Sequence, residues 1–176
     1  ERSYKKGTKE EINKFLKYFN DSKDKQNALK TIAILGDVLI KDIEQLNNIN
    51  KAVCWGRDIV NEPNSFLTAS QLATELEQIG LESSLKVKVF HKNEIEELKM
   101  GGLLAVNKGS IQPPTFTILE YKPDNARNQK PIVLVGKGVV YDTGGLSLKP
   151  TPNSMDLMKS DMGGAACMAG TIYAAA

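Results

Sequence analysis

Side chains that can bind a divalent cation follow an apolar run in the second half of the sequence. Ile132–Val135 is a row of aliphatic residues typical of a buried strand, and Lys137 and Asp142 follow it in a glycine-rich segment. Because ligands in open α/β sheets bind beyond the carboxyl ends of strands, such a fold would present a site here. Asp156 and Asp161 add carboxylates nearby, the ligand type that suits Mg²⁺, Mn²⁺ or Zn²⁺. Carboxylates beside lysines are also typical of solvated surface pairs, so the residue types alone leave both interpretations open.

Two other kinds of chemistry are poorly supported by the same residues. The segment Gly136–Gly138 lacks the G-x-x-x-x-G-K-[ST] spacing of a phosphate-binding loop, although a small phosphate-binding α/β protein stays an alternative. A Ser-His-Asp hydrolase needs a histidine base, and the sequence has one histidine, His91, at an expected surface turn. We interpret His91 as solvated or locally hydrogen-bonded.

Composition excludes several classes of protein. The chain has 176 residues, of which 41% are hydrophobic, so disorder throughout is not expected. Its formal net charge of +2 is too small to predict a nucleic-acid or acidic membrane partner, and no apolar stretch is long enough to span a bilayer. Cys54 and Cys167 belong to no CxxC pattern and are interpreted as reduced packing residues. A cytoplasmic protein with no membrane or nucleic-acid partner is therefore expected.

Hydrophobic periodicity predicts the elements that must position these side chains. Thr8 caps a short amphipathic helix, Asp37 caps a long helix that extends to about Val60, and Thr68 caps a helix that Gly80 is expected to end. The pattern then alternates between strands and helices. The expected elements are a strand at Leu85–Val89, a helix at Asn93–Met100 closed by Gly101–Gly102, and β-rich runs at Leu103–Val106, Thr115–Tyr121 and Ile132–Val135.

This alternation predicts an α/β fold with a mixed, largely parallel sheet flanked by helices and preceded by a helical connector. The Gly163–Ala166 segment is expected to begin a helix, with small residues that permit close packing. Asp156 is assigned to loop or helix-cap structure.

The glycine-rich segment also carries a recognisable pattern. The runs Val135–Pro150 and Met155–Ala166 closely resemble the signature of the leucyl (cytosol) aminopeptidase family. Upstream, Arg57–Pro63, Met100–Val106 and Glu120–Lys122 resemble the entry to that family's catalytic domain and its early strands. The resemblance implies a zinc-exopeptidase-like catalytic domain, with residues 51–176 as its N-terminal portion. Residues 1–50 would then be the remnant of an N-terminal domain and a connecting helix.

The resemblance implies roles for five residues at matching positions. Lys137 would ligate one metal, Asp142 would bridge two metals, and Asp161 would complete the ligands of the lysine-bound metal. Lys149 would be the catalytic lysine, and Met158 would line the pocket for the first side chain of the substrate. The implied cofactors are two divalent ions, Mn²⁺ or Zn²⁺, that activate a water to release N-terminal, leucine-like residues from peptides.

The same resemblance sets expectations about what lies beyond this sequence. The family's second signature, Asn-Thr-Asp-Ala-Glu-Gly-Arg, supplies further ligands and an arginine that binds bicarbonate, and it does not occur in these residues. We therefore expect this fragment alone to be inactive and a full-length protein to form a homohexamer. A non-catalytic binding protein that keeps the fold is the competing interpretation.

Overall fold

The computed structural model describes residues 3–5, 31–37 and 39–176. The chain divides into two compact units, Glu1–Asn47 and Asn48–Ala176. In the first unit, β1 (Ser3–Lys5) pairs in parallel with β2 (Thr31–Ala33). The amphipathic helix expected after Thr8 lies outside the described residues.

The long helix expected from Asp37 to about Val60 is confirmed as α2 (Ile40–Asn61). It begins later than the predicted cap at Asp37, because the Leu39 carbonyl accepts its first backbone hydrogen bonds, from Asp42 (3.0 Å) and Ile43 (3.4 Å). The helix ends at Asn61, ahead of Pro63, as the sequence indicates.

Helix α3 (Ala69–Leu81) begins where Thr68 predicts, since the Thr68 hydroxyl accepts a hydrogen bond from the Gln71 amide at 3.2 Å. The predicted end at Gly80 is wrong, because Gly80 lies inside the helix. A Cβ at Gly80 would collide with the Val87 side chain on the neighbouring strand. Glycine is needed here for close helix–strand packing and not for a left-handed cap.

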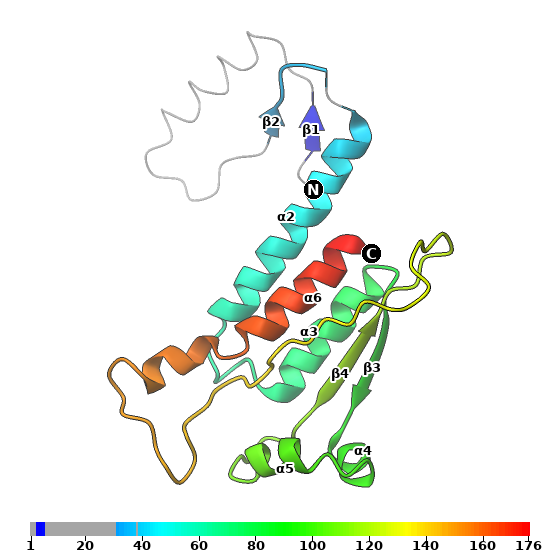
Figure 1. Ribbon diagram of the computed structural model, residues 1–176. Coiled ribbons are helices and arrows are strands. Elements are labelled where there is room, and N and C mark those ends of the chain that lie inside the picture. The colour runs from blue at the N-terminus through cyan, green and yellow to red at the C-terminus, as the bar shows by residue number, and fades with distance from the viewer. Residues whose placement is uncertain (1–2, 6–30, 38) are drawn as a thin grey trace. The chain divides into compact units, whose positions relative to one another are not determined.

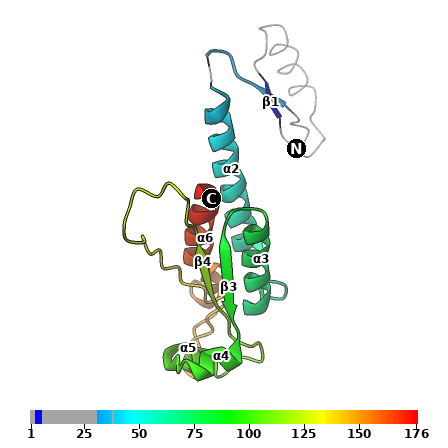
Figure 2. The same cartoon turned by 90° about the vertical axis from the view of Figure 1, so that its right-hand side faces the viewer.

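Two strands lie along α3 in the second unit, as Figures 1 and 2 show. β3 (Lys86–Phe90) and β4 (Phe116–Glu120) confirm two of the predicted strands and pair antiparallel, with Val87 opposite Leu119. They are joined through α4 (Lys92–Glu97) and α5 (Gly101–Asn107), which lie beyond one end of the strands. The α/β class is confirmed. The described strands form two separate two-stranded sheets, parallel in the first unit and antiparallel in the second, where the connection does not cross a face of the sheet.

Two predicted strands are wrong. Leu103–Val106 belongs to α5, which Gly101 and Gly102 begin after the left-handed turn at Lys99 (φ 54°) that follows α4. Ile132–Val135 is irregular, and its side chains are 45–85% exposed. No strand pairs with this run within the described residues, so its apolar side chains have no sheet to join.

The core of the second unit lies where α2, α3 and α6 (Gly163–Ala175) meet. Small residues allow α2 and α6 to approach closely, and a Cβ on Gly170 would lie 3.4 Å from the Ala52 carbonyl oxygen. The expected helix start at Gly163 is confirmed. The buried cluster comprises Ala52, Ile59, Leu67, Leu72, Leu76, Ile79, Met162, Ala166, Ala169 and Tyr173. No helix in the described part of the chain combines the length and apolarity that a membrane crossing requires.

Candidate metal centre

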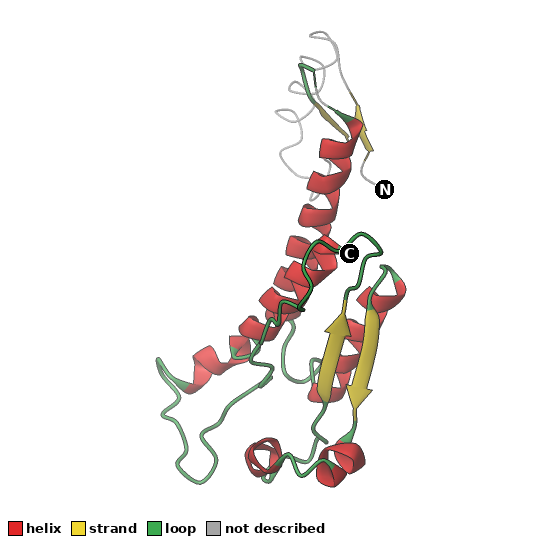
Figure 3. Ribbon diagram, turned by 45° about the vertical axis from the view of Figure 1, so that its right-hand side comes forward, coloured by secondary structure: helices red, strands yellow, loops and turns green. Residues whose placement is uncertain are grey.

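Lys137, Asp142 and Lys149 lie on a long irregular segment between β4 and the 3₁₀ helix η1 (Met155–Ser160), drawn as loop in Figure 3, and Asp161 directly follows η1. Lys137 and Asp161 meet there, with Nζ 2.6 Å from Oδ1. The lysine side chain is 57% exposed, whereas that of Asp161 is 12% exposed. The sequence pattern thus identified two residues that the fold brings into direct contact.

Glycines set the position of Lys137 against the start of α6. A Cβ on Gly136 would lie 2.6 Å from Ala165 Cα, and one on Gly164 would lie 3.1 Å from the Lys137 nitrogen. The Ala165 amide donates a hydrogen bond of 2.9 Å to the Lys137 carbonyl oxygen. Since no side chain separates the two backbones, the helix directly fixes the backbone that carries the lysine.

Asp142 and Lys149 form a second ion pair, with Nζ 2.8 Å from Oδ2. A tight turn holds them together. The Gly144 amide donates to Asp142 Oδ1 at 2.8 Å, and the Lys149 amide donates to the Thr143 carbonyl oxygen at 2.9 Å. Gly144 has a φ of +86° and packs against the Ser147 carbonyl, so a side chain there would be both strained and obstructed.

The charges of the two pairs act on one another. The Lys149 ammonium is the main cause that holds the pKa of Asp142 below its usual range, followed by the Gly144 hydrogen bond. The charge of Lys137 lowers this pKa further. Asp142 therefore stays an ionised carboxylate at lower pH than an ordinary aspartate does.

The helix η1 carries Met158 and leads to Asp161. Its start is held by the Tyr141 hydroxyl, which donates to the Met155 carbonyl oxygen at 3.0 Å. Its end is held by Lys159, whose Nζ donates to the Val60 carbonyl oxygen at the end of α2 at 2.9 Å. Met158 is half-buried. Tyr141 and Lys159 were missed by sequence reasoning, because their contacts depend on segments whose pairing the sequence does not reveal.

Asp156 has the structural role expected of it. Its carboxylate accepts hydrogen bonds from the amides of Asn153 (3.3 Å) and Ser154 (2.9 Å), and so stabilises the loop before η1. It contributes to no ion pair among the described residues.

The donor set fits a metal centre in part. Asp161 Oδ2 is buried and has no hydrogen-bond partner, which leaves a carboxylate lone pair available. No group of three His, Cys, Asp or Glu side chains suited to a metal occurs in the described part of the chain. The donors that are present are two carboxylates and two lysine amines, and a lysine binds a metal only as the neutral amine. These residues fit part of a cation site and not a complete coordination sphere.

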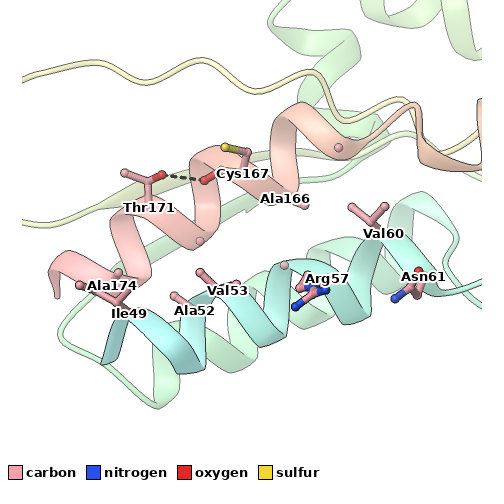
Figure 4. Close-up of a pocket in the computed structure, with 13 residues that line it drawn as sticks. Ile49, Ala52, Val53, Arg57, Val60, Asn61, Ala166, Cys167, Thr171 and Ala174 are labelled. Atoms are coloured by element: carbon pink, nitrogen blue, oxygen red, sulfur yellow. Dashed lines mark hydrogen bonds between the residues drawn. The ribbon is translucent and has the colours of Figure 1, made fainter. Parts of the chain in front are cut away.

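An open groove of about 660 Å³ lies elsewhere, between α2 and α6 (Figure 4). Apolar and small residues line most of it, among them Ile49, Val53 and Cys167. Both cysteines are free, as expected, but they are exposed, so their interpretation as packing residues is wrong.

Solved structures of similar fold are aminopeptidases and a maturation enzyme. The leucine aminopeptidase of Caenorhabditis elegans matches with a TM-score of 0.74 and 30% identity over 86% of this chain and 32% of that one. A bottromycin maturation enzyme in complex with Mn matches with a TM-score of 0.72 and 32% identity, again over 86% and 32% of the two chains. The fold is thus that of part of a chain of the leucine aminopeptidase type.

Sequence comparison gives the family. The catalytic-domain model of the cytosol aminopeptidase family matches residues 54–176, and the chain belongs to that family. A probable cytosol aminopeptidase of Chlorobaculum parvum is 56% identical over 120 residues, which cover 68% of this chain. The match covers 24% of that relative, so this chain spans about a quarter of its length.

Proposed function

We propose that this chain carries one part of the metal centre of an aminopeptidase that releases leucine-like N-terminal residues from peptides. The observation that carries the proposal is the pairing of Lys137 with Asp161 and of Asp142 with Lys149, within the segment that matches the family. Two divalent cations, Mn²⁺ or Zn²⁺, would activate a water and polarise the peptide carbonyl when bound here. The Mn complex of one structural relative supports this choice of ion.

The chain's own residues would have distinct roles. Asp161 would offer the oxygen that lacks a partner, and Asp142 would offer a carboxylate kept ionised by its neighbours. Lys137 would bind as a neutral amine, which requires it to lose its proton and leave its ion pair with Asp161. Lys149 would stay cationic and stabilise negative charge that develops on the carbonyl oxygen of the substrate.

The remaining elements of the proposal rest on the family resemblance. Met158, half-buried on η1, would line the pocket for the first side chain of the substrate. The whole protein would act in the cytoplasm as a homohexamer, with bicarbonate bound by residues outside these 176. Within this sequence, residues 51–176 would belong to the catalytic domain and residues 1–50 to the preceding domain and its connecting helix.

Metal analysis and hydrolysis assays test the proposal together. Mn²⁺ or Zn²⁺ binding is measured by calorimetry on this chain, on Asp142→Ala and on Asp124→Ala, a matched control because Asp124 is an exposed loop carboxylate. Hydrolysis of leucine p-nitroanilide is measured on this chain and on a chimera in which residues 54–176 replace the matching segment of the Chlorobaculum parvum relative.

We expect the Asp124→Ala chain to bind metal as the unaltered chain does, and the Asp142→Ala chain to bind it at least tenfold more weakly. We also expect hydrolysis by the chimera and none by its Asp142→Ala variant. Metal binding unaffected by Asp142→Ala, together with an active Asp142→Ala chimera, would contradict the proposal. If the unaltered Chlorobaculum parvum relative hydrolyses leucine p-nitroanilide and the chimera does not, a non-catalytic protein is favoured.

A further inference from the structure

The contacts of the candidate metal centre are nested within one stretch of chain. The outer contact joins Lys137 to Asp161, which are 24 positions apart, and the inner contact joins Asp142 to Lys149. Between these ion pairs lies the hydrogen bond from Tyr141 to Met155, which are 14 positions apart. The stretch therefore holds three nested contacts, with a neutral hydrogen bond between two ion pairs.

The hydrogen bond from Tyr141 to Met155 connects the two segments that carry the charged groups. Tyr141 directly precedes Asp142, and Met155 begins the helix η1 that leads to Asp161. The hydroxyl-to-carbonyl distance is 3.0 Å, and the bond is partly buried, so water competes less well for both groups than at an exposed site. This bond therefore joins the segment that carries Asp142 directly to the start of the helix that leads to Asp161.

Other contacts do not replace this bond. The Met155 amide donates to Pro150 at 3.0 Å and the Asp156 amide donates to Thr151 at 3.3 Å, but both bonds stay within the loop. Lys159 ties the far end of η1 to α2 and not to the segment that carries Asp142. Pro150 follows Lys149, which is itself bonded to Asp142 and Thr143, so that route is indirect. Among the described contacts, the Tyr141 hydroxyl makes the direct hydrogen bond between residues 141–143 and the start of η1.

We propose that Tyr141 is a positioning residue for the metal centre: its hydroxyl fixes η1, and thereby Asp161, relative to Asp142. The inference rests on the proposed function for its consequence on metal binding. Its structural part, the anchoring of η1, can be tested without metal. Phenylalanine is the matched replacement, because Tyr141→Phe removes the hydroxyl and keeps the ring.

The test combines amide hydrogen exchange with Mn²⁺ calorimetry on Tyr141→Phe. We expect exchange of the η1 amides to become roughly three- to tenfold faster, the effect of losing one hydrogen bond, with the amides of α4 and α5 unchanged. We expect the dissociation constant for Mn²⁺ to rise by a similar factor. Tyr121→Phe is the control, since no described residue bonds the Tyr121 hydroxyl, and it should change neither quantity.

Each outcome supports or overturns either the anchoring of η1 or the role of Tyr141 in metal binding. Unchanged exchange in η1, or an equal increase in α4 and α5, would overturn the anchoring role, because the second result indicates a general loss of stability. Faster exchange confined to η1 with an Mn²⁺ affinity within twofold of the unaltered chain would overturn the role in metal positioning. If the unaltered chain takes up no Mn²⁺, the calorimetry is repeated on the chimera: Mn²⁺ bound by neither would overturn the proposed function, and local acceleration in η1 would still support the anchoring by Tyr141.

Discussion

Replacement of Glu82 by glutamine should weaken the packing of three helices in the second unit. Glu82 follows α3, and its Oε2 lies 2.8 Å from Lys51 Nζ on α2 and accepts a hydrogen bond of 2.8 Å from the Tyr173 hydroxyl on α6. Gln78 donates to the other carboxylate oxygen at 3.0 Å. These partners, with Lys51 first, lower the pKa of Glu82 to about 2. Glu82→Gln removes the charge and keeps the size of the side chain.

The magnitude follows from this pKa and from the exposure of the carboxylate. A fall from 4.5 to about 2 corresponds to about 3 kcal/mol of favourable interaction with the ionised form. The Glu82 side chain is 38% exposed, so solvent screening reduces the contribution to about 1 kcal/mol. Because the folded pKa lies below the unfolded one, this stabilisation is complete above pH 4.5 and is lost as the pH falls toward about 2.

Urea unfolding followed by fluorescence measures the effect directly. The sequence has one tryptophan, Trp55, and its ring packs edge-on against Tyr173 with centroids 6.4 Å apart, so the signal reports on this cluster. Glu82→Gln should lower the unfolding free energy by about 1 kcal/mol at pH 7 and by less than half of that near pH 3. Glu96→Gln is the control, because its pair with Lys92 is exposed and 3.9 Å long. An equal loss at both pH values, or none at pH 7, would refute the reasoning.

Three further predictions concern backbone contact, charge and core packing. Gly136→Ala would place a Cβ 2.6 Å from Ala165 Cα and should lower stability by about 1–3 kcal/mol in urea, whereas Gly102→Ala, with open space, should not; equal effects would contradict the close contact. Lys149→Met in the chimera should lower kcat for leucine p-nitroanilide by roughly 10²–10³-fold, and an unchanged kcat would exclude its proposed role. Leu67→Ala, at a side chain with 0% exposure, should cost about 2–5 kcal/mol in calorimetric unfolding, and a loss below about 1 kcal/mol would argue against a packed site.

The sequence was most informative where a local interaction decides the structure. Thr68 predicts the start of α3 because a hydroxyl that caps a helix needs nothing beyond the next turn. The alternation in Leu85–Val89 likewise predicts β3. By contrast, Leu103–Val106 is a short apolar run that fits a strand or a buried helix equally well, and periodicity cannot choose between them. In the structure this run is helical, and the Leu104 amide donates to the Met100 carbonyl oxygen at 3.1 Å at the start of α5.

For the candidate site, the sequence offers a set of residues but not the contacts between them. The pattern from Lys137 to Asp161 identified four side chains, and the structure pairs them two by two. The partners were not predictable, because each distance depends on the Gly144 turn and on the fit of Gly136 against α6. Tyr141 gives no signal of its own in the sequence, since its role arises from a hydroxyl that reaches a backbone carbonyl on another segment.

The nested order of these three contacts, two ion pairs and the hydrogen bond between them, also affects how this region folds. Closure of the inner pair, Asp142 and Lys149, brings Tyr141 near Met155, and that bond in turn brings Lys137 near Asp161. Each step closes a short loop, and the entropy cost of closing a loop grows with its length. Contacts that are local in sequence also form faster than distant ones. The contacts of the candidate metal centre should therefore form one after another, with the Asp142–Lys149 pair first and the Lys137–Asp161 pair last.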